Sequence, residues 1–318
     1  MFYGYLTESN DALDFVEKLI KMLFHYTSIN ALKGILCNPT SNQGLCFWAT
    51  RFDCFGDDQE YKLGIDTIKR LLPKLEERLQ PDRRIAHSFN YDEILKNTTI
   101  PFPYVVSFTD TNNSGFMWEH YAEQGKGIVL ALDDSQRIVN EYTKHLFLRS
   151  CWYIGELTDD ELYKEIEDEY FNAAFDLLKG PLKTFALTIL AKAPQLFVVM
   201  IGRYLLSYVA TRIKGESFQK EKETRVIYAA PRMELASLME PYEEQLRTFP
   251  IDVEGFKDAM RSEKVRIGAN GKSIFYQDIY LPGTVLKEVY IKDHSQLGMV
   301  EDVLEEKGFK KDVTVVAL

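Results

Sequence analysis

PYVVSFT, residues 103–109, is the stretch that decides the fold of this 318-residue chain. Its β-branched and aromatic residues are typical of a strand buried in a sheet. The turn sequence TNNSG at residues 111–115 follows, and residues 116–123 then read as a short helix. After a turn at residues 125–127, residues 128–132 form a second apolar run. We therefore expect a sheet with short helices between its strands.

Upstream of this block, helices and strands are expected to alternate. Apolar residues recur at helical spacing in residues 11–23, and Ser28 stands where it can cap the helix that follows. The expected helices are residues 11–23, 29–36 and 60–80, the last interrupted at Pro73, and the expected strands are residues 24–27 and 44–50.

Downstream, the pattern changes to helix between residues 158 and 211. Residues 193–210 have the length of a minimal membrane span, but Arg203 near their middle would be costly in lipid. We therefore expect a buried helix there and no membrane partner. The expected strands on either side are residues 146–154, 224–229, 274–281, 285–291 and 313–316. Residues 1–318 thus read as a single α+β domain with a helical insertion at about 158–211.

The composition indicates a folded protein, with 46% hydrophobic and 13% aromatic residues. A formal net charge of −10 repels polyanions, and the short basic pairs at residues 83–84 and 310–311 are too small to overcome this repulsion. We therefore expect no duplex nucleic-acid partner. Residues 1–5 do not resemble the start of a signal peptide, which predicts a cytoplasmic protein. The oligomeric state stays open.

Neither the cysteines nor the acidic residues predict a metal site. The cysteines form no CxxC pair and have no histidine at ligand spacing, so we expect free thiols in a reducing compartment. Asp57, Asp58 and Glu60 form an acidic turn that is expected to face water. Phosphate-loop, dinucleotide-loop, HExxH and GxSxG motifs do not occur. The cysteines are Cys37, Cys46, Cys54 and Cys151.

Four short motifs stand in order between residues 24 and 230. They are FHYTS with ALKGIL (residues 24–28 and 31–36), FWAT with Asp57 and Glu60 (residues 47–50), VSFT with Met117, Trp118, Tyr121 and Gly127-Ile128 (residues 106–109), and KEKETR (residues 220–225). Together they resemble the DUF2971 family of uncharacterised bacterial proteins. The chain departs from the family pattern at Gly56, Asp58 and Thr224, where Asn, Pro and an aromatic residue are usual. The helical insertion is not part of the resemblance.

The same residues are similar, more distantly, to ADP-ribosyltransferase folds. There, a first-strand histidine binds a ribose hydroxyl of NAD, and a Ser/Thr-bearing strand and an E-x-E sequence complete the site. In this chain, His25, Ser107 and the pair Glu221/Glu223 are residues of the same types and follow one another in the same order along the sequence. The similarity implies a mixed, mostly antiparallel sheet core in which an imidazole, a hydroxyl and a carboxylate meet in one hollow. It also implies NAD as a substrate, and either a macromolecular acceptor, such as a protein, or hydrolysis of NAD.

The chemistry of ADP-ribose transfer assigns roles to these residues. The bond to nicotinamide breaks through an oxocarbenium-like transition state, which nearby negative charge stabilises. Glu223 is the first choice for this carboxylate and Glu221 the second. Aromatic faces suit a flat or cationic ring, and a guanidinium can pair with a phosphate. The catalytic set is Glu223, Glu221 and His25, and the cofactor-binding set is His25, Tyr26, Thr27, Ser107, Trp118, Tyr121 and Arg225.

Each of these residues also has a plain structural interpretation. His25 would bond a buried carbonyl, Arg225 would form a salt bridge, and Trp118 would anchor the core. Glu221 and Glu223 would belong to a solvated charged turn. Two functions therefore stay open: an ADP-ribosyltransferase-like enzyme, or a non-catalytic nucleotide-binding or toxin/phage-defence module on the same scaffold.

Overall fold

The computed structural model describes residues 22–41, 43–55, 58–79, 102–133, 146–166, 209–228, 263–268 and 271–318. The predicted helix at residues 11–23 and the predicted insertion at 158–211 fall largely outside the described residues. The insertion is represented at its two ends by helix α8 (Asp159–Ile166) and the 3-10 helix η6 (Ala210–Arg212). The division of the chain into one domain stays a prediction.

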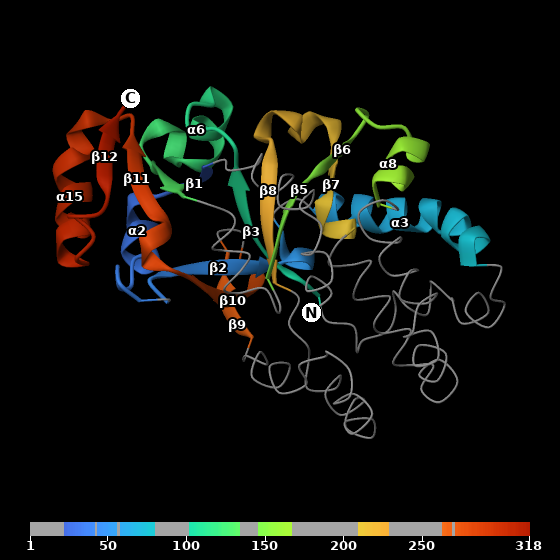
Figure 1. The fold of residues 1–318 in the computed structure, drawn as a ribbon, viewed down its shortest axis with the longest axis horizontal. Helices are drawn as coiled ribbons and strands as arrows, with labels where there is room; N and C mark the ends of the chain where they lie inside the picture. The colour runs from blue at the N-terminus through green and yellow to red at the C-terminus, as the bar shows by residue number, and fades with distance from the viewer. Residues whose placement is uncertain are drawn as a thin grey trace, which may run out of the picture.

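The described residues form a mixed α/β structure around an open, mostly antiparallel sheet (Figure 1). The sheet has ten strands, and its main path runs β12-β11-β4-β1-β3-β2-β10-β9, with β8 on β3 and β5 on β8. Every pair in it is antiparallel except β11 with β12. The strands are β1 (Leu23–Thr27), β2 (Leu45–Arg51), β3 (Tyr104–Thr109), β4 (Ile128–Leu132), β5 (Leu146–Ser150), β8 (Glu223–Tyr228), β9 (Lys264–Ile267), β10 (Ser273–Leu281), β11 (Leu286–Ile291) and β12 (Thr314–Ala317).

Strand β3 is the branch point of the sheet. Along one edge it pairs with β8 over its full length, from Tyr104 opposite Tyr228 to Thr109 opposite Glu223. Its other edge is shared, because β1 pairs with it at Thr109 while β2 pairs at Tyr104 and Val105. The expected strand PYVVSFT is therefore confirmed, and it is the element that joins the two parts of the sheet.

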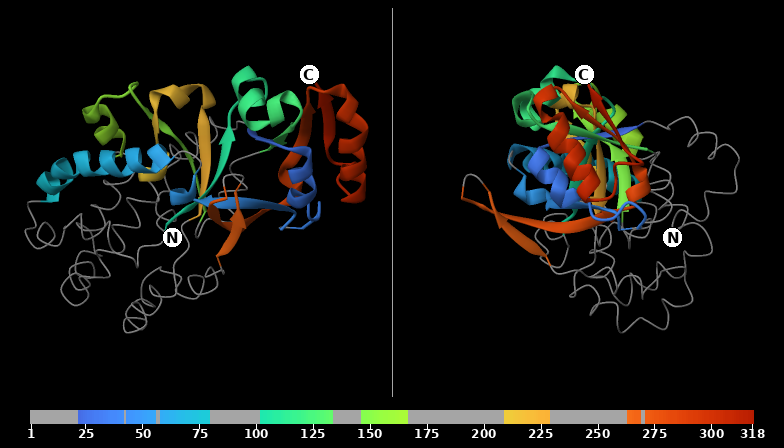
Figure 2. Two further views of the ribbon diagram at one scale, coloured as in Figure 1. Left: turned by 180° about the vertical axis from the view of Figure 1, so that it is seen from behind. Right: turned by 90° about the vertical axis from the view of Figure 1, so that its left-hand side faces the viewer.

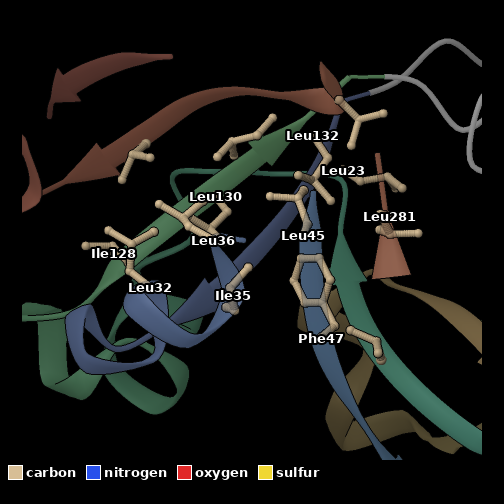
Figure 3. Packing of buried hydrophobic residues seen from close by; sticks show 14 of the residues in the cluster. Leu23, Leu32, Ile35, Leu36, Leu45, Phe47, Ile128, Leu130, Leu132 and Leu281 are labelled. Atoms are coloured by element: carbon tan, nitrogen blue, oxygen red, sulfur yellow. The ribbon is translucent and has the colours of Figure 1, made fainter. Parts of the chain in front are cut away.

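The two faces of the sheet have separate apolar clusters. On one face, α2 (Ile29–Ile35) and α15 (Leu297–Glu306) pack on the larger cluster, in which Figure 3 shows Leu32 and Leu36 beside Ile128 and Leu130. On the opposite face, α6 (Gly115–Tyr121) packs Trp118 against the neighbouring strand β1. We call the first the α2 face and the second the α6 face.

A smaller layer lies beside β8. Here β6 (Trp152–Ile154) and β7 (Ile213–Gly215) form a parallel pair, and α3 (Asp58–Leu79) packs against β7 and η6. An ion pair between Arg70 and Asp159 joins α3 to α8, which lies beside α3 in Figure 1. The remaining 3-10 helices are η2 (Phe52–Cys54), η3 (Glu123–Gly125), η7 (Glu216–Glu221), η9 (Gly283–Val285) and η10 (His294–Gln296).

Local structure differs from expectation in three places. Pro73 does not interrupt α3, which runs through it from Asp58 to Leu79. The strand expected at residues 146–154 divides at Cys151 into β5 and β6; the N–H of Cys151 donates to the carbonyl of Glu223 on β8 at 2.9 Å, and β6 then pairs with β7. Strands β7 and β9 and helix α15 were not expected. No helix among the described residues is long and apolar enough to cross a membrane.

Candidate functional site

The α6 face carries most of the predicted site residues. In an antiparallel ladder, directly opposite residues place their side chains on the same face. Thr109 lies opposite Glu223 and Ser107 opposite Arg225, so these four side chains share a face. Because Phe24 also lies opposite Thr109 and belongs to the α6 cluster, that face is the α6 face.

Glu223 stands at the centre of a group of buried charges. Arg225 donates to its carboxylate twice, from Nε at 2.8 Å and from Nη2 at 3.0 Å. The Lys214 ammonium bonds the same carboxylate, and the Glu223 backbone N–H donates to the Tyr153 hydroxyl at 2.7 Å. Glu223 is therefore fixed from both sides, with its side chain only 4% exposed.

Two further carboxylates complete this group. Arg225 also donates to Glu60 on α3 and to the carbonyl of Thr211, while Lys214 donates to Glu221. We call the five side chains Glu60, Lys214, Glu221, Glu223 and Arg225 the buried charge cluster; each is at most 7% exposed. Its three carboxylates face two cations, so the fully ionised cluster carries one excess negative charge.

The cations keep Glu223 ionised. Burial alone would raise the pKa of this carboxyl, but Arg225 and Lys214 outweigh burial and lower the pKa to about 2. In the same way, burial works against the charges of Lys214 and Arg225, yet the surrounding carboxylates raise the pKa of both above their ordinary values. Glu223, Lys214 and Arg225 thus all keep their charges at neutral pH.

The cluster approaches the surface at Glu221. This carboxylate accepts a hydrogen bond of 2.5 Å from the hydroxyl of Tyr121, whose side chain is 45% exposed at the end of α6. Burial and this carboxylate together raise the pKa of Tyr121 well above its usual range, so the hydroxyl remains a donor. Lys222, between the two glutamates, adopts a left-handed conformation with φ 44° and ψ 49°.

Thr109 is an incompletely bonded member of this face. Its side chain is fully buried and directly opposite Glu223. Among the described residues, the Thr109 hydroxyl has no hydrogen-bond partner. A buried hydroxyl without a partner costs about 1–3 kcal/mol, so a bound water or ligand atom would be stabilised at this position.

Tyr26 and Trp118 have structural partners. Their rings meet edge to face with centroids 5.5 Å apart. Tyr26 donates to the carbonyl of Thr111 at 2.9 Å, and Trp118 donates from Nε1 to the carbonyl of Asn112 at 2.8 Å. Trp118 is only 2% exposed, so both rings fasten α6 and the preceding turn to the sheet.

His25 lies on the α2 face, away from the charge cluster. Its ring contacts Phe47 and Phe108, and its Nδ1 bonds the backbone carbonyl of Ser107 at 2.9 Å. Burial lowers the pKa of this imidazole although the carbonyl raises it, which favours the neutral form. Strand alternation places Thr27 on the same face as His25. The imidazole therefore performs the structural role of bonding a main-chain carbonyl where β1 and β3 separate.

The predicted meeting of imidazole, hydroxyl and carboxylate is thus not found. The Ser107 side chain is exposed on the α6 face, and Glu223 is enclosed by cations on that face, while His25 points to the other. The physical reason is strand periodicity, since Phe24 rather than His25 is the β1 residue in register with Thr109. The structure brings together Tyr121, Glu221 and Glu223, and it separates His25 from them.

Three residues of the site were missed. Glu60 was expected to face water, but it is 7% exposed and paired with Arg225. Lys214 lies in no motif, and Thr109, although it ends the VSFT motif, was given no role. Spacing gave one usable signal for Glu60, because Gly64 and Ile68 follow it at helical intervals on the same side of α3. The plain interpretation of Glu221 and Glu223 as a solvated turn is wrong for these two side chains, which are buried, while Lys222 between them is exposed.

Fold and site together define a mixed α/β protein with an open, mostly antiparallel sheet and a buried charge cluster. Residues 117–226 match the model of a family described as "Protein of unknown function (DUF2971)". The matched segment contains Tyr121 and every member of the charge cluster except Glu60. The match supports the resemblance of the motifs in this segment. Neither a curated protein nor a solved structure matches the chain.

Proposed function

We propose that this protein binds a nucleotide that carries a cationic ring, of which NAD is the representative, at the Tyr121–Glu221 end of the buried charge cluster. The observation that carries the proposal is the hydrogen bond from half-exposed Tyr121 to buried Glu221. This hydrogen bond places a carboxylate of the negatively charged cluster directly beside a side chain that a ligand can contact.

Charge supports a cationic ligand. A group of three carboxylates and two cations attracts a further positive charge, and burial of the carboxylates makes this attraction stronger than it would be between groups in bulk water. The oxidised nicotinamide ring is positively charged and flat. The face of a tyrosine ring attracts such a cation by about 0.5–2 kcal/mol. The hydrogen bond from the Tyr121 hydroxyl to Glu221 fixes the orientation of the tyrosine ring.

The geometry favours binding over turnover. Stabilising an oxocarbenium ion requires a carboxylate whose charge is available to the reacting carbon. Glu223, the first choice from the sequence, is bonded by both Lys214 and Arg225, so its charge is already compensated. His25, the expected ribose ligand, faces the opposite side of the sheet. The protein is accordingly proposed as a sensor or carrier of the nucleotide.

ADP-ribosyl transfer is the second candidate, and one observation favours it. Glu221 bonds one cation where Glu223 bonds two, and its other oxygen faces exposed Tyr121. If the protein reacts with NAD, Glu221 is therefore the carboxylate that stabilises the transition state. Glu223 would then hold Lys214 in position as a structural partner.

Calorimetric titration with NAD⁺ and NADH tests the proposal. The two ligands differ in ring charge, so a site of negative potential is expected to bind NAD⁺ more tightly, by about tenfold for 1.4 kcal/mol. Glu221→Gln is expected to abolish this preference. It leaves two carboxylates against two cations, so the cluster loses its negative excess and the fold is expected to be retained. Glu216→Gln, an exposed carboxylate at the start of the same 3-10 helix, is the matched control and is expected to behave as wild type.

Nicotinamide release distinguishes the two candidates. Binding without turnover predicts that NAD⁺ is recovered intact after prolonged incubation, by chromatography. Release that Glu221→Gln removes and Glu223→Gln reduces less would establish the second candidate. Equal affinity for NAD⁺ and NADH, or no binding of either, would contradict both candidate functions.

A further inference from the structure

A second feature of the molecule lies far along the sheet from the charge cluster, at β9. This strand pairs with β10 along one edge, with Lys264 opposite Tyr276 and Arg266 opposite Ile274. Among the described strands, none pairs with its other edge. Figure 2 shows the β9–β10 hairpin reaching out from the rest of the sheet in its right-hand view.

The outer edge of β9 presents defined backbone groups. The N–H of Gly268 donates to the carbonyl of Lys272 on the β10 side at 2.8 Å. Backbone polar groups alternate in direction along a strand, so those of Lys264 and Arg266 also face β10. Val265 and Ile267 therefore direct their N–H and C=O groups outward. A row of this kind is a template on which another strand can pair.

The side chains of β9 are exposed and divided by face. Val265 is 57% and Ile267 70% exposed, and both lie on one face of the strand. On the other face, the Arg266 guanidinium lies 5.6 Å from the ring of Trp48 and 6.0 Å from that of Tyr276. Trp48 is itself 52% exposed. The strand thus offers an apolar row on one side and a cation over aromatic rings on the other.

Arg266 provides an uncompensated charge. Lys264, on the same face, forms an ion pair with Asp278. Arg266 has no ion pair within the described part of the chain, although it is exposed and free to meet one. An acidic side chain directly across from Arg266 would form a cross-strand pair worth about 0.2–1 kcal/mol.

A second copy of this chain does not fit the edge. Symmetric antiparallel pairing that keeps the faces aligned can be centred on any residue of β9. Centres at Lys264 and Arg266 set a cation against its own copy, and a centre at Val265 sets Lys264 against Arg266, and like charges directly opposite each other are destabilising. A centre at Ile267 sets Arg266 against Gly268, which offers it no acidic partner. Charge complementarity therefore selects a different chain.

We propose that β9 is a docking edge that takes up an extended segment of a partner protein as an additional antiparallel strand. The segment alternates acidic residues, which meet Arg266 on one face of the strand, with apolar residues, which lie beside Val265 and Ile267 on the other face. Main-chain hydrogen bonds to Val265 and Ile267 supply the binding energy, and the alternation supplies the specificity.

Two synthetic peptides test the proposal on the full chain: an eight-residue peptide that alternates glutamate with valine, and one that alternates lysine with valine. Fluorescence polarisation of labelled peptide at low salt is expected to show binding of the glutamate peptide only. Val265→Pro removes an outward N–H without removing a bond to β10, and edge strands accept proline. It is expected to weaken binding by at least about tenfold, the equivalent of one lost backbone bond.

Matched variants separate docking from misfolding. Val265→Thr keeps the N–H and the strand propensity, and it is expected to bind within about threefold of wild type. Arg266→Glu is expected to reverse the preference, so that the lysine peptide binds and the glutamate peptide does not. Equal binding of both peptides, or undiminished binding by Val265→Pro, overturns the proposal. A dimer of the chain that Val265→Pro converts to monomer overturns it too, in favour of self-pairing.

Discussion

Arg225 on β8 and Glu60 on α3 form an ion pair that joins residues 165 positions apart in the sequence. The same guanidinium holds Glu223 at 2.8 and 3.0 Å and donates to the carbonyl of Thr211. One side chain, only 1% exposed, therefore connects the helix, the sheet and the segment that leads into β7. The buried charges thereby tie three separate segments of the chain to one another.

Replacing Arg225 is expected to be strongly destabilising. Arg225→Met leaves three carboxylates with one buried cation, and breaking a buried ion pair in this way costs about 3–5 kcal/mol. Arg225→Lys restores the charge but not the planar fork that reaches Glu60, Glu223 and Thr211 together, so it is expected to rescue only part of the loss. Urea unfolding followed by circular dichroism measures both. Full rescue by lysine would show that the charge alone, without the fork, holds α3 to the sheet.

The pH dependence of stability is expected to report on Glu223. Its pKa in the folded protein is about 2, below the ordinary value of 4.5, because Arg225 and Lys214 outweigh its burial. The stabilisation is therefore present above about pH 5 and lost as the pH falls toward 2. The shift corresponds to a stability change on the order of 3 kcal/mol.

Glu223→Gln is the test of this dependence. The variant is expected to be less stable than wild type at pH 7, yet to lose less stability between pH 5 and pH 2, measured as the urea midpoint at each pH. Glu216→Gln, whose carboxylate is exposed, is the control and should follow the wild-type curve. Parallel curves for wild type and Glu223→Gln would mean that Glu223 does not titrate with the unfolding transition.

A pair of helix glycines is expected to give opposite results. In α2, a methyl group at Gly34 would meet nothing within 4 Å, so Gly34→Ala should stabilise the protein by up to about 1 kcal/mol through helix propensity. In α3, a methyl group at Gly64 would lie 2.5 Å from the carbonyl oxygen of Ala210. Gly64→Ala should therefore destabilise by about 1–3 kcal/mol, because the backbone of η6 must move.

Thermal unfolding of the two variants in parallel is a direct comparison, since the chemical change is the same in both. It also tests the packing of α3 against the segment next to Lys214. If Gly64→Ala were as stable as Gly34→Ala, the close approach of α3 and η6 would be absent in solution. The charge cluster would then need a different support for Glu60.

Local patterns predicted much of this fold, while long-range pairing did not follow from them. PYVVSFT, the Ser28 cap and the run at residues 128–132 appear as expected, because hydrophobic periodicity and capping act within a few residues. Strands β7 and β9 span only three and four residues, so even the alternation of polar and apolar residues in β9 is too short to mark a strand in the sequence. The parallel pair β6–β7 joins segments about sixty residues apart, which no local rule can detect.

The candidate site was predicted in its residue types but not in its geometry. Arg225, Glu221 and Glu223 were identified, and Arg225 has the salt bridge that its plain interpretation assigned to it. His25 failed to join them because the register of β1 on β3 aligns Phe24 with Thr109, and alternation then turns the imidazole to the opposite face. Register depends on the partner strand, so a sequence of one strand cannot supply it.

The conformation of Lys222 leads to a final prediction. Lys222 has φ 44° and ends η7, with its N–H donating to the carbonyl of Gln219 at 3.2 Å. This left-handed turn lets the glutamates on both sides reach the same ammonium of Lys214. A non-glycine residue costs about 1–2 kcal/mol in this conformation, whereas glycine adopts it freely.

Lys222→Gly is therefore expected to stabilise the fold by up to about 1 kcal/mol, after the greater entropy of glycine in the unfolded chain is counted. Lys222→Val, with a branched side chain in the same conformation, should destabilise it. Lys220→Gly is the control, because Lys220 is exposed on the same 3-10 helix without a positive φ and should gain nothing. Urea midpoints order the three variants. If Lys222→Gly instead lost as much stability as Lys220→Gly, the left-handed turn would not persist in solution. The ion pairs of Glu221 and Glu223 with Lys214 would then not be held by that turn.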